Sequence, residues 1–341
     1  LESVGGELNA YTTKEKVCFY ASFLDNYYSK AVELLTDITF NSTFPEKEIE
    51  KERTVILEEM SMYLDAPDDA IADEFDAQVF QNHTLGNNIL GTTESVKRFT
   101  KANFQQFIAQ NTDTHRIIFA SVGNFTLAEV LKMVSKHLIE IPEVHTVRER
   151  KPFSTYKPTS VQKKKPISQA HATIGCLAPA ISDARRLPYF MLINLLGGPA
   201  MNTRLNMSLR EKYGLVYAVE ASYTPYIDTG MTSIYFGTER QQLNRATDLV
   251  LKEIKKLQTD KLGIIQLKQT KDQLKGQLAM AEENNANLML MLGKSLLDAE
   301  KIDSLDEVFQ QIEAITSSQL LEMANELLQI DQMSTLTYLP E

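Results

Sequence analysis

The stretch KERTVILEEM, residues 51–60, decides the fold prediction, because it places two carboxylates on the apolar side of a helix. The surrounding pattern predicts a helix over about 45–65. At about 100° per residue, Glu52 and Glu59 project with the apolar residues of that helix, namely Ile49, Val55, Ile56 and Tyr63. A carboxylate in an apolar setting is costly unless it is paired, protonated or bound to a metal. Glu52 and Glu59 are therefore candidate functional residues; the alternative is that Glu59 or its neighbour Glu58 is a solvated helix carboxylate.

The composition is that of an ordinary globular protein, with 341 residues, 43% apolar and 23% charged, which is enough for two domains. The net charge of −10 argues against a nucleic-acid partner, and the one basic run, QKKKP at 162–166, is too short to change that. No apolar run approaches the roughly 18 residues of a membrane span, so no membrane partner is expected. The two cysteines, Cys18 and Cys176, fit no disulfide framework or metal spacing and are expected to be small core residues.

Hydrophobic periodicity predicts strands and helices along the first half of the chain. Residues 1–6 are expected to end a helix at two glycines. Residues 142–167, with four prolines and a charge run, are expected to be a linker. The elements expected between them are strands at 7–12 and 16–24, helices at 26–39, 45–65, 67–80 and 101–109, a buried strand at 116–125 and an amphipathic helix at 126–141.

The second half has its own order of elements, from a strand at 168–179 to a strand at 333–339. The Gly-rich segment GGPAMNTRL, 197–205, follows a helix rather than a strand, so it is interpreted as a helix stop and tight turn and not as a phosphate loop. The other expected elements are helices at 183–198 and 203–214, strands at 215–223 and 230–238, and helices at 241–257, 262–282, 286–299, 304–314 and 316–329.

The two halves resemble each other. LREKYG at 209–214 precedes two strands and two long helices, as LESVGG at 1–6 does. By this comparison the first half lacks a strand and a helix, roughly forty residues, that the second half has. The sequence therefore predicts an α+β protein of two homologous domains, 1–141 and 168–341. Each is expected to be a mainly antiparallel sheet with helices on one face, the first domain being truncated at its N-terminus.

Four motifs occur in an order that resembles a known family. They are LESVGGELNAYTTKEKVCFYASFL at 1–24, EKERTVILEEM at 50–60, LGNNILGT at 85–92 and LREKYGLVYAV at 209–219. Together they look like the insulinase/pitrilysin family of inverted zinc peptidases, in particular its short two-domain bacterial members and mitochondrial processing peptidase. The resemblance covers essentially the whole chain and implies a zinc-dependent metalloendopeptidase that hydrolyses peptides or unfolded segments in a chamber between domains. An unrelated helical structural protein would not account for the ordered motifs.

The resemblance implies a Zn²⁺ cofactor held by an HxxEH helix and by a distal glutamate. On this sequence the distal ligand maps to Glu59, and Glu52 would orient a ligand histidine without binding the metal itself. HxxEH does not occur in the 341 residues, and no histidine has a histidine partner at helical spacing among His83, His115, His137, His145 and His171. The resemblance places HxxEH upstream of Leu1, so the chain as given is expected to be inactive.

The resemblance also implies a catalytic pair in the second half, Arg210 and Tyr217. Arginine would hold a peptide carbonyl or carboxylate, and the tyrosine hydroxyl would donate to the developing oxyanion. The alternative from the residues alone is a surface arginine and a core tyrosine, since Gly214 prevents a shared helix face. Asn9 and Ala10 would bind substrate by adding a peptide strand to the edge of their own strand; the alternative is an ordinary strand.

The partners follow from the same resemblance. A two-domain chain with both sets of residues is expected to form a homodimer in which Arg210 and Tyr217 of one subunit complete the zinc site of the other. A heterodimer is the other arrangement, and a non-catalytic peptide-binding or assembly subunit is the alternative function. The expected location is the cytoplasm of a bacterium.

Overall fold

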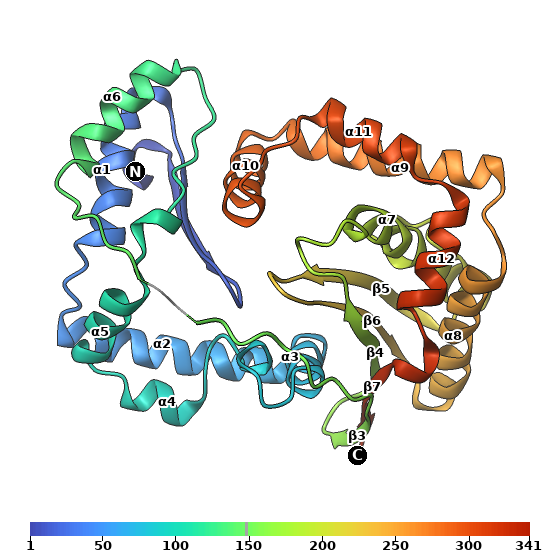
Figure 1. Cartoon of the computed structure of the whole chain (residues 1–341). Helices are drawn as coiled ribbons and strands as arrows, with labels where there is room; N and C mark the ends of the chain where they lie inside the picture. Colours follow the sequence, from blue (N-terminus) through green and yellow to red (C-terminus); the bar gives the residue numbers. More distant parts are fainter. Residues whose placement is uncertain (147–148) are drawn as a thin grey trace. The chain divides into compact units, whose positions relative to one another are not determined.

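A computed structural model describes residues 1–146 and 149–341, which fold as two compact units (Figure 1). Each unit gathers segments that are distant in the sequence. Unit 1 comprises Leu1–Met60, Ile89–Arg150 and Ala281–Ile302, and unit 2 comprises Ser61–Asn88, Lys151–Met280 and Asp303–Glu341. These compact units differ from the expected division at 1–141 and 168–341, because the chain crosses between them several times.

Unit 1 is mainly helical and contains one hairpin. Strands β1 (Glu7–Thr12) and β2 (Val17–Ser22) pair in antiparallel fashion. A small core forms where α1 (Tyr28–Phe40) meets α6 (Leu127–Leu138), with Tyr28, Val32 and Val134 buried. The other elements are η1 (Glu2–Val4), η2 (Asp25–Tyr27), α2 (Glu46–Asp65), α4 (Thr93–Arg98), α5 (Lys101–Asn111), η4 (Thr114–Arg116) and α10 (Asn285–Ala299).

Helix α10 belongs to unit 1 although it lies late in the sequence. The Lys16 ammonium, next to the hairpin turn, lies 2.8 Å from the Asp298 carboxylate of α10, and both side chains are largely buried. Gly293 of α10 faces Ala120, where an added Cβ would lie 3.2 Å from the alanine Cβ. The hairpin turn is therefore fixed to a helix nearly 300 residues further along the chain.

Unit 2 contains a five-stranded sheet in the order β3-β7-β4-β6-β5. Neighbouring strands are antiparallel except for β3 and β7, which are parallel. The strands are β3 (Ser160–Lys165), β4 (Ala170–Ala178), β5 (Val216–Pro225), β6 (Gly230–Thr238) and β7 (Ser334–Pro340). The sheet is therefore mainly antiparallel, as the sequence predicts, and the α+β class is confirmed.

Helices cover both faces of this sheet, whereas the sequence analysis placed them on one. The large core joins one face to α7 (Arg186–Gly197), α8 (Leu243–Thr259) and α12 (Ser317–Leu327). Helix α3 (Pro67–Val79) covers the other face, where Phe75 packs with Leu336 and Tyr338 of β7. The sequence assigned α3 to the first domain and so missed this layer. The remaining elements are η3 (Thr84–Gly86), η5 (Asn206–Lys212), η6 (Arg240–Gln242), α9 (Ile264–Glu282), α11 (Leu305–Ala314) and η7 (Ile330–Gln332).

Three expected elements differ from the structure. Residues 117–125 form no strand, because they have no strand to pair with: within the described residues, β1 and β2 pair only with each other. The first unit therefore has a two-stranded hairpin instead of a larger sheet. Residues 160–165, inside the expected linker, form the edge strand β3, whose lysines are typical of protected edges. Residues 206–212 form a π-helix where an α-helix was expected.

Candidate functional site

The structure brings Arg210 and Tyr217 together. The guanidinium carbon of Arg210 lies 5.4 Å from the centre of the Tyr217 ring, within the roughly 6 Å range of a cation–π interaction. Tyr217 is 84% exposed, so it does not fill the core, which was the alternative that its sequence left open. The two side chains thus form one exposed pair on unit 2, although a glycine separates them along the chain.

An irregular helix and a tight turn place Arg210. Helix η5 is a π-helix, a rare form that is frequently found at functional sites. It is followed by Gly214, whose φ of +59° is in the left-handed region that favours glycine. The Gly214 N–H donates to the carbonyl oxygen of Arg210 at 2.9 Å, and the Leu215 N–H donates to that of Leu209 at 2.9 Å. The chain therefore turns directly after the π-helix and returns past Arg210 as β5.

A β-bulge places Tyr217. Two residues of β5, Tyr217 and Ala218, lie opposite the single residue Gly237 of β6. The extra residue allows Val216 and Val219 both to be buried, which regular alternation along a strand would forbid. Bulges commonly redirect a side chain beside an active site. The bulge here turns Tyr217 outward while the strand stays anchored in the core of unit 2.

Two further groups hold the arginine. One terminal nitrogen of Arg210 donates to the Met201 Sδ at 3.5 Å, and its Nε lies 3.8 Å from a carboxylate oxygen of Glu211. Met201 belongs to the Gly-rich segment GGPAMNTRL. Since a guanidinium has five N–H donors, Arg210 retains donors for a carbonyl or carboxylate of a ligand.

The carboxylates on α2 lie in a different setting, in unit 1. Glu52 is exposed and Glu59 is partly buried. Neither side chain has a hydrogen-bond or ion-pair partner within the described residues. None of the residues of α2, all of which the structure describes, is buried. Val55 and Tyr63 of the expected apolar stripe are 54% and 37% exposed. The stripe that made these glutamates unusual is thus largely uncovered by the described residues.

The residues present do not make a zinc site by themselves. Zinc in a peptidase takes three protein ligands at about 2.0–2.3 Å. Glu52 and Glu59 are two helical turns apart, about 10 Å along the helix axis. Among residues 1–146 and 149–341, no three histidine, cysteine, aspartate or glutamate side chains lie in an arrangement that could hold a metal. Glu59 could supply one ligand, but the described residues do not supply the others.

Four of the five histidines have polar partners other than Glu59; the exception among the described residues is His137, whose buried Nε2 has no hydrogen-bond partner. His83 bonds the carbonyl oxygen of Lys151 at 2.9 Å, and His171, in β4 as expected, bonds the Tyr235 hydroxyl at 2.8 Å. The His115 and His145 rings lie 5.0 Å apart, each next to a carboxylate. His137 lies in the last turn of α6, where the sequence placed it. None of these positions adds a ligand to Glu59 in the described part of the chain.

The hairpin β1–β2 offers the strand edge expected at Asn9 and Ala10. The Thr13 N–H donates to the Lys16 carbonyl oxygen at 2.8 Å, so odd-numbered residues of β1 bond to β2 and Ala10 directs its backbone groups outward. The Ala10 N–H is bonded at 2.9 Å by the Asn9 side-chain oxygen. A peptide added to this edge would therefore compete with the side chain of Asn9 for the donor of Ala10.

Cys176 is buried in the core, as expected, whereas Cys18 is only half-buried. Cys176 is buried in β4, and burial raises its pKa to about 12. Burial also raises the pKa of Cys18, which lies opposite Tyr11 in the hairpin. At neutral pH both thiols stay protonated and unreactive.

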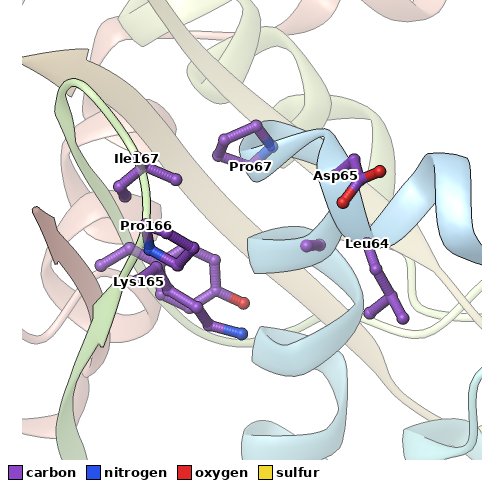
Figure 2. Close-up of a pocket in the computed structure, with 8 residues that line it drawn as sticks. Leu64, Asp65, Pro67, Lys165, Pro166 and Ile167 are labelled. Atoms are coloured by element: carbon purple, nitrogen blue, oxygen red, sulfur yellow. The ribbon is translucent and has the colours of Figure 1, made fainter. Parts of the chain in front are cut away.

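A small pocket in unit 2 lies apart from the expected site residues. Figure 2 shows it between the end of α2 with the start of α3 and the segment that leaves β3. Its volume is ≈ 90 Å³, too small for a peptide chain, and Lys165 on its wall is bonded to Glu74. It is lined by Leu64, Asp65, Pro67, Ala70, Lys165, Pro166, Ile167 and Tyr338.

Comparison with known proteins decides the family. The description "Insulinase (Peptidase family M16)" matches residues 1–93, and "Peptidase M16 inactive domain" matches residues 98–274. The chain belongs to the insulinase family of peptidases. Within this M16 family it is 33% identical to an uncharacterized zinc protease of Bacillus subtilis, over 96% of this chain and 79% of that protein. It is 30% identical to an uncharacterized zinc protease of Mycobacterium leprae, over 96% of this chain and 74% of the other.

Solved structures show the same fold. An M16 inactive-domain structure from Pseudomonas fluorescens superimposes with a TM-score of 0.87 at 18% identity, covering 100% of this chain and 82% of the other. A protease from Helicobacter pylori gives a TM-score of 0.85 at 18% identity, covering 99% and 83%. The resemblance inferred from the four motifs is thus confirmed at the level of the M16 family and fold.

One residue of the pair's surroundings was missed by the sequence analysis. Met201 contacts Arg210 from a segment that was interpreted only as a helix stop. The two glycines and the proline of this segment predicted a turn. Their spacing did not indicate that Met201 would be the side chain facing the π-helix.

Proposed function

We propose that this M16 family member is a zinc-dependent endopeptidase acting on peptides or unfolded segments, and that Arg210 and Tyr217 contact the substrate. The observation that carries the proposal is the pairing of these two side chains, 5.4 Å apart, at a π-helix and a β-bulge. The π-helix and the β-bulge are two departures from regular structure, and together they place an exposed tyrosine beside an arginine. Since such departures are common at functional sites, we expect the pair to have a function beyond packing.

The chemistry of the pair suits peptide hydrolysis. The fork of Arg210 can hold a substrate carbonyl or carboxylate with the donors that Met201 and Glu211 leave open. The exposed hydroxyl of Tyr217 can donate to an oxyanion as it develops. The outward backbone groups of Ala10 can extend β1 by a peptide strand, once the side chain of Asn9 turns away.

The metal part of the proposal rests on the relatives, which are named zinc proteases. Glu59 is proposed as one zinc ligand and Glu52 as the carboxylate that orients another ligand. The described residues do not complete a zinc site, and the resemblance assigns the other ligands to an HxxEH motif that the 341 residues do not contain.

The same proposal includes a homodimer in which Arg210 and Tyr217 serve the zinc site of the partner subunit, with a heterodimer as the other arrangement. It also places the protein in the bacterial cytoplasm. As to membranes, none of the helices in the described part combines the length and the apolar character needed to cross a bilayer.

The second candidate function is a non-catalytic, peptide-binding or assembly subunit of the same fold. One observation favours it: residues 98–274 match the inactive domain of the family. In that case Arg210 and Tyr217 would bind a peptide without completing a hydrolytic site.

The test is hydrolysis of an unfolded polypeptide, fluorescein-labelled casein, by the protein made from its complete gene. Tyr217→Phe keeps the ring and removes the hydroxyl, and we expect it to lower kcat/KM about 100-fold. The control is Tyr213→Phe, which changes a 37% exposed tyrosine at the end of the π-helix that carries Arg210. Full activity of Tyr217→Phe would overturn the transition-state role. A wild type that binds casein and never cleaves it would establish the second candidate instead.

A further inference from the structure

The segment GGPAMNTRL acquires a role from its contacts with the pair at Arg210 and Tyr217. The sequence marked it as a turn, and the structure shows what the turn presents. One terminal nitrogen of Arg210 donates to the Met201 Sδ at 3.5 Å, while the guanidinium lies over the Tyr217 ring. Arg210 is thus flanked by a thioether and by an aromatic ring.

Contacts on both sides restrict the conformations that the Arg210 side chain can adopt. Its side chain is 34% exposed, and its charged neighbour Glu211 is 3.8 Å away and half-exposed. A long side chain in that setting samples many rotamers, and a ligand that immobilises it loses affinity for that reason. The Tyr217 ring is itself 84% exposed, so it restrains the arginine from one side only. A second contact from Met201 narrows the directions in which the fork can point.

The turn that carries Met201 is fixed to the rest of unit 2. The Asn202 side chain donates to Gln273 of α9 at 3.0 Å. One turn of α9 further, Gln277 accepts a hydrogen bond of 3.0 Å from Asn194, a residue of α7 that is only 6% exposed. These two amide pairs hold the segment on α9, on either side of the glycines.

The close approach at Gly198 explains why a glycine stands in this segment. A Cβ at this position would lie 2.2 Å from the Asn194 side-chain oxygen and 2.8 Å from its backbone oxygen. The Asn206 side chain then bonds Thr203 at 3.0 Å and fastens the far end of the turn to the π-helix. The segment is therefore a rigid support, from which Met201 projects with 55% of its surface exposed.

We propose that Met201 is a positioning residue that holds Arg210 in the orientation that receives a substrate peptide. This inference rests on the proposed role of Arg210 in substrate binding. Met201 itself contacts the arginine and not the reacting atoms, so its effect must pass through Arg210.

The experiment measures peptide binding without hydrolysis. The anisotropy of fluorescein-labelled casein, with chelator present to prevent cleavage, gives Kd for the protein made from its complete gene. We expect Arg210→Ala to raise Kd at least 10-fold and Met201→Ala to raise it about 5-fold. Met201→Gln keeps an acceptor at similar reach and should stay within about twofold of wild type. The control Met207→Ala removes a methionine that is 50% exposed on the same π-helix and should leave Kd unchanged.

A double-mutant cycle separates positioning from general damage to the turn. Met201→Ala should have no further effect when Arg210 is already alanine, and equal thermal midpoints should show that the variants are folded. An equal loss in both backgrounds, or no loss from Met201→Ala alone, would overturn the inference while leaving the role of Arg210 intact. Unchanged binding by Arg210→Ala would instead remove the proposed function, and the inference with it.

Discussion

The Arg210–Tyr217 pair and the Glu52–Glu59 pair belong to different compact units and are held in different ways. Around the first pair, Leu209, Leu215 and Val219 are buried in the large core of unit 2 and fix both backbones. The second pair stands on a helix that buries none of its described residues. Packing within the chain therefore sets the geometry of Arg210 and Tyr217, whereas Glu52 and Glu59 are set only by the helix that carries them.

The contrast between the two units can be tested by truncating one apolar residue on each of two consecutive helices. Phe75 of α3 is 0% exposed and contacts the sheet, so Phe75→Ala should lower the free energy of unfolding by about 3–5 kcal/mol. Val55 of α2 is 54% exposed, and Val55→Ala should change it by less than about 0.5 kcal/mol. Urea denaturation measures both. A loss well above about 0.5 kcal/mol in Val55→Ala would mean that Val55 is covered in solution and that the contrast is wrong.

The next effect concerns the hairpin that offers a strand edge in unit 1. Lys16 and Asp298 form an ion pair of 2.8 Å with side chains only 13% and 7% exposed. Asp298→Ala leaves the largely buried Lys16 ammonium without its partner. It should lower the free energy of unfolding by about 2 kcal/mol, which is less than the loss expected when a fully buried ion pair is broken. Amide exchange in β1 and β2 should quicken.

The exposed pair Lys51–Glu48, with side chains 60% and 54% exposed, provides the control for that experiment. Glu48→Gln should alter neither stability nor exchange measurably. If Asp298→Ala behaves in the same way, α10 does not hold the hairpin, and the edge at Ala10 is less rigid than the contacts indicate.

The smallest effect is a pH dependence in unit 2. Burial raises the pKa of Glu74, but hydrogen bonds from Lys163 and Lys165 outweigh it and hold the pKa below its usual value. A lowered carboxyl pKa contributes stability that is present above about pH 4.5 and is lost as the pH falls through the folded-state value. Between about pH 5 and 3, the free energy of unfolding of wild type should therefore fall by up to about 1 kcal/mol more than that of Glu74→Gln. Parallel pH curves for the two proteins would exclude this contribution.

Local patterns predicted the elements of unit 2 well, because its strands and helices carry clear periodicity. The strand at 333–339 and the helices expected at 241–257, 262–282, 304–314 and 316–329 are examples, and the structure confirms them. Pairing between distant segments was harder to predict. The run at 116–125 reads as a strand but has no neighbouring strand in the described residues, while the lysine run at 163–165 reads as a loop and pairs with β7.

The candidate site shows the same limit. The residues alone could not pair Arg210 with Tyr217, because Gly214 ends the helix between them; the family resemblance did, and the turn and the bulge supply the physical reason. The contact between Met201 and Arg210 could not be predicted from the sequence, because it depends on the path of a turn and on the amide pairs that fix this turn to α9. The roles of Arg210, Tyr217, Glu52, Glu59, Asn9 and Ala10 stay predictions.

The role of Glu59 is tested most directly by the zinc content of the protein made from its complete gene, measured per chain for wild type, Glu59→Gln and Glu58→Gln. Glu58 is the exposed neighbour on the same helix and serves as the matched control. We predict about one zinc per chain in wild type and in Glu58→Gln, and a strong loss in Glu59→Gln, since a peptidase zinc site needs each of its three protein ligands. Full zinc in Glu59→Gln, or none in wild type, would contradict the assignment of Glu59 as a zinc ligand.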